Sequence, residues 1–107
     1  MYLIGIDIGT TGTKAVVFDE QGSAVGSGYR DYPLKTPRPG YATQSAEDWW
    51  DAVACSVRDA VRPVDPAQVA AIGLSTQGAS MTAVDRDFRP LCDVITWMDS
   101  RAQREAR

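Results

Sequence analysis

The sequence predicts an α/β fold, and three observations within its 107 residues support this. Short apolar runs with glycine-containing connections fill the first third of the chain, a pattern typical of strands joined in a meander. One stretch with apolar residues at helical spacing follows, and a further apolar run comes after it. We therefore expect three antiparallel strands, then a helix and a return strand.

The three N-terminal strands differ in composition. Residues 2–8 form an apolar run that ends in a Gly/Thr turn, as expected of a strand buried on both faces. Residues 14–19 are rich in valine, and Glu20-Gln21-Gly22 closes this second strand. Residues 24–32 are more polar and include two glycines, which favours a position near the edge of the sheet.

A loop and one helix come next. Residues 33–44 hold three prolines and one glycine, so we expect a loop there. Ser45 can cap the helix, and acidic residues in the first turn complement the helix dipole. Apolar residues then recur at helical spacing up to Pro63, and we interpret the two tryptophans among them as packing residues. These apolar residues are Trp49, Trp50, Val53, Val57 and Val61.

The last third predicts a return strand and a second helix. Residues 69–75 read as the return strand, and residues 81–84 as a further apolar strand before a polar turn. Residues 94–97 lead towards a helix that Asp99 or Ser100 caps and that continues to Arg107. Together these elements describe an α/β layer of the ribonuclease-H-like or actin-like kind.

Composition excludes several classes of function. A net charge of −3 gives no reason to expect nucleic acid or a membrane as a partner. The only basic cluster is Arg101, Arg104 and Arg107, whose helical spacing indicates a solvated face. Histidine is absent and the two cysteines, Cys55 and Cys92, lie far apart, which argues against structural zinc and a histidine-based nucleophile. Unpaired thiols and the lack of a basic, apolar leader predict a cytoplasmic protein.

Asp7 is the candidate metal ligand. Aspartate is depleted in strands, and a carboxylate between two isoleucines is costly to bury without a partner. A Mg²⁺ ion, or its water shell, at the end of the strand would offset that cost. The alternative is an aspartate that only caps the following turn.

The turn after the first strand is the candidate phosphate site. Glycines let the backbone approach a ligand, and threonine hydroxyls, backbone amides and a lysine suit phosphate oxygens. An ordinary hairpin would need the glycines but not three threonines and a lysine. A Walker A loop is excluded, because Thr13 precedes Lys14 and Ala15 follows it. The candidate cofactor-binding residues are Asp7, Gly9, Thr10, Thr11, Gly12, Thr13 and Lys14.

This turn resembles the first phosphate motif of the superfamily that contains actin, heat-shock chaperones and sugar kinases. The resemblance covers the pattern strand, D-x-G-T-T-x-x-K, strand. It implies that Asp7 serves a Mg²⁺ site and that the threonine-rich turn meets the β- and γ-phosphates of ATP. ATP and Mg²⁺ are therefore the expected cofactors.

Further segments are similar to the FGGY carbohydrate kinases in order and spacing. They are residues 32–40 with Gln44, 47–50, 71–75 with Gln77, and the W-x-D-x-R element at 95–101. Residues 1–107 thus resemble the N-terminal part of the first domain of such a kinase, without its second, nucleotide-binding domain. The resemblance also allows for a homodimer of the full-length enzyme.

The resemblance implies a sugar or polyol site at Gln77, Gly78, Ala79, Trp97 and Asp99. Trp97 would pack on the apolar face of the sugar and Asp99 would contact hydroxyls. Two plainer interpretations stay open: Gln77 could satisfy backbone groups, and Trp97 could be a core residue beside a surface Asp99–Arg101 pair. Gly78-Ala79 departs from the Met-His of xylulose kinases and the Arg-Glu of glycerol kinases. We favour a xylulose-like ketopentose as the substrate.

The implied activity is ATP-dependent phosphorylation of a sugar hydroxyl. In the family, the carboxylate base lies far downstream, so we assign no catalytic residue within residues 1–107 and expect this piece alone to be inactive. Two alternatives remain: a non-catalytic remnant, and an actin-like or chaperone-like ATP-binding module whose ATP turnover does not depend on sugar.

Overall fold

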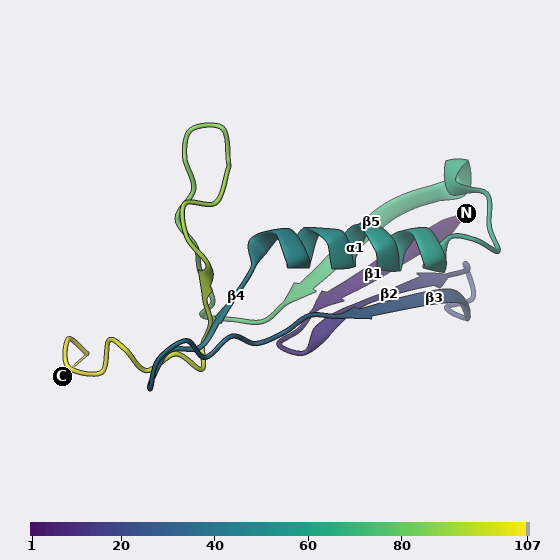
Figure 1. Cartoon of the computed structure of the whole chain (residues 1–107). Coiled ribbons are helices and arrows are strands. Elements are labelled where there is room, and N and C mark those ends of the chain that lie inside the picture. Colours follow the sequence, from purple (N-terminus) through teal and green to yellow (C-terminus); the bar gives the residue numbers. More distant parts are fainter. Residues whose placement is uncertain (107) are drawn as a thin grey trace.

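A computed structural model describes residues 1–106 and shows a four-stranded sheet with one helix across one of its faces (Figure 1). The strand order is β3-β2-β1-β5. β1 pairs antiparallel with β2 and parallel with β5, and β2 pairs antiparallel with β3. The predicted α/β order is confirmed, with β3 at an edge as expected. The elements are β1 (Tyr2–Ile8), β2 (Gly12–Phe18), β3 (Ala24–Asp31), α1 (Ala46–Ala60) and β5 (Val69–Thr76), with a short 3₁₀ helix η1 (Pro66–Gln68) before β5.

The core lies between the sheet and α1. Alternate residues of β1 and β2 point towards the helix, because successive side chains of a strand face opposite sides. Valines of α1 and of the segment that follows it pack against this layer, which explains their helical spacing in the sequence. The buried members of this cluster are Ile4, Ile6, Ala15, Val17 and Ala60.

Two glycines of β3 let the helix lie unusually close to the sheet. A Cβ atom at Gly26 would clash with the carbonyl oxygen of Ala60, and one at Gly28 with that of Ser56. The helix consequently packs mainly on β3 and β2 and only marginally on β1. β5 stays largely exposed along its length.

The expectation that the first strand is buried on both faces is wrong. Ile4 and Ile6 face the helix, whereas Leu3 is 46% exposed and Asp7 is also exposed on the other face. Within residues 1–106 no second layer covers that face, which we call the open face. The premise that Asp7 is a buried carboxylate therefore fails, and its assignment rests on its position beside the turn.

The start of α1 agrees with the sequence. The Ser45 side chain accepts a hydrogen bond from the backbone N–H of Asp48, as an N-cap does. Trp49 is half-buried, with its ring 6.3 Å from that of Tyr32. Trp50 is 71% exposed, so the expected packing role is wrong for this tryptophan. It lies one position beyond the apolar stripe and lines a hollow together with Val84 and Phe88.

A second, two-stranded sheet joins parts of the chain that are far apart in sequence. β4 (Thr43–Gln44) pairs antiparallel with β6 (Val94–Ile95). β4 lies inside the segment expected to be only a loop. Residues 81–95 form a projecting arm, green in Figure 1, in which single bridges join Met81 to Ile95 and Val84 to Pro90. These bridges replace the strand expected at residues 81–84.

The helix expected after Asp99 does not form in the described residues. Residues 101–106 make successive turns and are exposed, and Arg107 lies outside the described part of the chain. The segment offers only small apolar side chains, so no apolar stripe stabilises a helix against a neighbouring layer. No helix within residues 1–106 is long and apolar enough to span a membrane.

Candidate functional site

The predicted phosphate turn connects β1 to β2 at the end of the sheet that also carries the end of β5. Asp7 lies between Lys14 of β2 and Ser75 of β5 in the strand register. Asp7 and Lys14 are both exposed and line a groove of about 420 Å³ on the open face. The structure thus brings one negative and one positive side chain to the base of the turn, open to a ligand.

The carbonyl groups of the turn are held by side chains from elsewhere in the fold. Gly9 O accepts hydrogen bonds from Tyr32 Oη and, at 3.0 Å, from Gln77 Nε2. Thr10 O accepts one from Gln44 Nε2 at 2.7 Å. In a trans peptide the following N–H points opposite to the carbonyl, and the described chain has no cis bond. The N–H groups of Thr10 and Thr11 therefore point away from these donors, an arrangement suited to an anion.

Gln44 is a site residue whose role the sequence did not reveal. Its side chain is fully buried, yet every polar atom has a partner. Besides the bond to Thr10 O, Gln44 Oε1 accepts from Trp49 Nε1 and from Gln77 Nε2, each at 3.1 Å. A buried amide left unpaired would be costly, so this network fixes the turn against α1 and the end of β5. A glutamine in a proline-rich loop carries no signal of such a position.

Thr13 and Gly12 have roles in the turn that differ from those expected. Thr13 is fully buried on the helix side, with its hydroxyl 3.5 Å from Tyr32 Oη. That hydroxyl is not available to a phosphate in this structure, contrary to the prediction. Gly12 is needed for space, because a Cβ there would lie 2.5 Å from Arg30 O and from Tyr29 Oη. Thr10 and Thr11 remain the accessible threonines of the turn.

Two of the predicted sugar residues, Gln77 and Trp97, contact this turn. Trp97 Nε1 donates to Thr10 Oγ1 at 2.9 Å, across 87 positions of sequence. Trp97 is 56% exposed, so within residues 1–106 it is not the core residue of the alternative interpretation. Gly78 is exposed, and Ala79 adopts a left-handed backbone (φ 51°) that non-glycine residues seldom adopt.

Gln77 uses its whole amide within the protein. Nε2 donates to Gly9 O and to Gln44 Oε1, while Oε1 accepts from Ser80 Oγ at 3.0 Å. This geometry favours the interpretation that Gln77 satisfies backbone and amide groups. Contact with a substrate stays a prediction for this residue.

Asp99 is also fully engaged. Its side chain is 1% exposed; Oδ2 accepts from Ala42 N, and both oxygens accept from the Arg101 guanidinium. The Arg101 guanidinium, 3.8 Å above the Tyr41 ring, holds the pKa of the Asp99 carboxyl well below its usual range. The carboxylate therefore ties the loop before β4 to the W-x-D-x-R element, and contact with a sugar stays a prediction.

Asp99→Asn is expected to lower the melting temperature at neutral pH and to matter less in acid. Because the pKa of Asp99 is depressed in the folded state, its contribution is complete above the ordinary value of 3.8 and is lost as pH falls towards the folded value. The difference in melting temperature between wild type and variant should therefore shrink below about pH 4. Thermal unfolding of the full-length protein from pH 7 to pH 3 measures this; a constant difference would contradict it.

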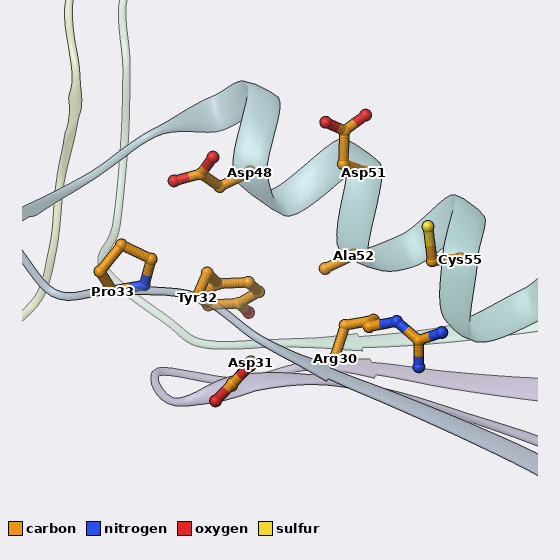
Figure 2. A pocket seen from close by; sticks show the side chains of 8 residues that line it. All are labelled: Arg30, Asp31, Tyr32, Pro33, Asp48, Asp51, Ala52 and Cys55. Carbon is orange, nitrogen blue, oxygen red and sulfur yellow. The ribbon is translucent and has the colours of Figure 1, made fainter.

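A separate hollow lies between the end of β3 and α1. Figure 2 shows its lining, which encloses about 220 Å³ and includes Arg30, Tyr32, Asp48 and Cys55. None of the predicted site residues lines it. Tyr32 links the hollow to the turn, since its hydroxyl reaches Gly9 O, and Arg30 and Asp31 pair with Thr13 and Gly12 in the sheet. We do not assign this hollow a ligand.

The donor set suits a Mg²⁺ ion held mainly by water and phosphate. Within residues 1–106 no three acidic, cysteine or histidine side chains cluster as a metal cage. Mg²⁺ in phosphate-transfer sites commonly keeps several waters and uses only one or two carboxylates. Asp7, exposed at the base of the turn, fits such a ligand or a partner of its water shell.

Comparison with known proteins shows which family this chain resembles. The profile described as "FGGY family of carbohydrate kinases, N-terminal domain" matches residues 2–107. The chain is 34% identical to a glycerol kinase of Thermococcus gammatolerans, over 94% of this chain and 21% of that protein. It is 37% identical to a gluconokinase of Bacillus subtilis, over 95% of this chain and 20% of that protein.

The crystal structure of a ligand-bound xylulose kinase from Lactobacillus acidophilus superposes with a TM-score of 0.90 at 36% identity, over 97% of this chain and 21% of that one. The sheet, helix and turn are thus those of an actin-like ATPase layer. The chain belongs to the FGGY family of carbohydrate kinases. It spans about a fifth of the length of the relatives it matches.

Proposed function

We propose that the full-length protein transfers the γ-phosphoryl group of ATP to a hydroxyl of a sugar or polyol, with a xylulose-like ketopentose favoured. The observation that carries this proposal is the hydrogen bond between Trp97 and Thr10. It joins the residue expected to bear a sugar to the residue expected to meet a phosphate. A phosphotransferase needs those two sites in contact, because the acceptor hydroxyl must lie in line with the γ-phosphorus.

In this proposal, the outward N–H groups of Thr10 and Thr11, with Lys14, bind the phosphate oxygens and neutralise charge that develops during transfer. Mg²⁺, held beside Asp7, would supply further neutralisation of the β- and γ-phosphates. Trp97 offers its exposed ring to the apolar face of the sugar. By family resemblance, the base that accepts the hydroxyl proton lies outside residues 1–107.

The most specific part of the proposal is the identity of the substrate among those of the family. Relatives named as glycerol, gluconate and xylulose kinases match to similar degrees. The loop at Gly78 and Ala79 offers no charged group or ring to a substrate. A loop without a cation to pair with a carboxylate favours a neutral ketose over an anionic sugar acid.

The test is ATP turnover by the full-length protein with and without a panel of xylulose, other ketoses, gluconate and glycerol. We expect ADP release that depends on a sugar, greatest with a ketopentose, together with formation of the sugar phosphate. ATP turnover that no sugar alters would indicate an actin-like or chaperone-like ATPase instead. A complete lack of turnover and of nucleotide binding would indicate a non-catalytic remnant.

A further inference from the structure

Trp97 is held beside the phosphate turn by two hydrogen bonds, one from its indole and one from its backbone. The indole N–H donates to Thr10 Oγ1 at 2.9 Å, and the backbone N–H of Trp97 donates to Ser80 Oγ at 3.1 Å. Ser80 in turn donates to Gln77 Oε1, whose amide holds Gly9 O. Trp97 is nevertheless more than half exposed as a residue within residues 1–106. One side chain thus has its N–H committed to the turn and its face free for a ligand.

The direction of the Trp97–Thr10 bond determines what Thr10 can do. An indole nitrogen is a donor only, so the threonine oxygen must be the acceptor. The threonine then keeps its own hydrogen for another acceptor, directed away from the indole. At a turn whose neighbouring N–H groups face outward, this hydroxyl becomes an additional directed donor to a phosphate oxygen.

We propose that Trp97 is a positioning residue for phosphoryl transfer, whose indole N–H orients the Thr10 hydroxyl as a donor to the transferring phosphate. This inference rests on the proposed function, because it takes the turn as the phosphate site. It adds a second task to the residue expected to carry the sugar.

A consequence is that sugar and nucleotide binding are coupled through one side chain. A sugar that packs on the ring restricts the indole, and a restricted indole holds the Thr10 hydroxyl in place. Coupling between two ligands is reciprocal, so bound nucleotide should strengthen sugar binding by the same factor. Loss of the N–H alone should remove this coupling while leaving the ring.

The experiment compares Trp97→Phe with wild type in the full-length protein. Phenylalanine keeps an aromatic face but has no N–H. We expect kcat to fall by about 10-fold or more, the loss typical of a hydrogen bond to a charged group. The KM for sugar at saturating nucleotide should rise by no more than the factor by which bound nucleotide strengthens sugar binding in wild type, since the platform remains. Trp50→Phe is the matched control, because Trp50 is an exposed tryptophan outside this network; its kinetics should equal those of wild type.

A double-mutant cycle isolates the bond. Thr10→Val removes the hydroxyl and Thr10→Ser keeps it. Trp97→Phe should cause no further loss of kcat in the Thr10→Val background, but nearly its full loss in the Thr10→Ser background. Independent, multiplicative effects of Trp97→Phe and Thr10→Val would overturn the inference, as would a change confined to the KM for sugar.

Calorimetric binding of Mg·ADP and of the non-hydrolysed ATP analogue AMP-PNP separates this inference from the proposed function. We expect Trp97→Phe to weaken binding of AMP-PNP, which has a γ-phosphoryl group, more than binding of ADP. Equal affinities of wild type and Trp97→Phe for AMP-PNP would refute the inference even if sugar phosphorylation is found. A wild type that binds the nucleotide but phosphorylates no sugar would refute the proposed function alone. A wild type that binds no nucleotide would refute both.

Discussion

Asp7→Asn is expected to lower the kcat for sugar phosphorylation by at least about 100-fold, the scale of removing one group that stabilises transition-state charge. The carboxylate is exposed at the base of the turn, beside Lys14 and at the edge of the groove on the open face. Asparagine keeps its size but has no charge to hold Mg²⁺ or its water shell. The steady-state rate of the full-length protein, measured as a function of Mg²⁺ concentration, checks this; the variant should need more metal to reach its own maximum.

The matched control is Asp51→Asn, an exposed carboxylate on α1. It should retain wild-type kinetics and Mg²⁺ dependence. Both exposed substitutions should change the stability of the fold by no more than about 0.5 kcal/mol, so a loss of rate reports on chemistry. If Asp7→Asn phosphorylates sugar as wild type does, the assignment of Asp7 to the metal is wrong.

Gly28→Ala is expected to destabilise the fold by about 1–3 kcal/mol, the usual cost of forcing an extra carbon into a packed contact. A Cβ at this position would clash with the carbonyl oxygen of Ser56, a backbone atom of α1 that cannot rotate aside. The helix would have to move away from β3, which would loosen its packing on Ala15 and Val17. Thermal or denaturant unfolding of the full-length protein measures the loss.

Gly73→Ala in β5 is the control for that substitution. A Cβ there has no atom within 4 Å and needs no unusual φ. Since alanine restricts the unfolded chain more than glycine does, this change should be neutral or slightly stabilising. Equal destabilisation by the two substitutions would show that close contact between helix and strand is not what Gly28 provides.

Local patterns in the sequence predicted most of the fold. Strands β1, β2, β3 and β5, the Ser45 cap and the valine stripe of α1 depend on neighbours in sequence, and each lies close to where it was expected. The strand expected at residues 81–84 is replaced by isolated bridges. β4 and β6 were not predictable as a pair, because two-residue strands carry no periodicity and depend on a partner about fifty residues away. The prediction of a second helix was wrong for a related reason: a capping residue without an apolar stripe does not stabilise a helix.

The candidate site was predictable in part. Asp7, Thr10 and Trp97 were predicted as site residues from motifs, and the structure brings Thr10 and Trp97 into contact. The burial of Thr13 followed from the two-residue alternation of β2, which also buries Ala15 and Val17, but the density of threonines in the turn obscured it. The structural role of Gln44 could not be predicted, because it depends on three partners in three separate segments.

The hydrogen bonds that hold the carbonyl groups of Gly9 and Thr10 have a consequence for how a ligand would bind. A free glycine-rich turn loses conformational entropy when it closes on a ligand, at about 1–2 kcal/mol per ordered residue. Here Tyr32, Gln44 and Gln77 impose that loss when the chain folds, before any ligand arrives. The turn is preorganised, so more of its interaction energy with a phosphate is retained as affinity.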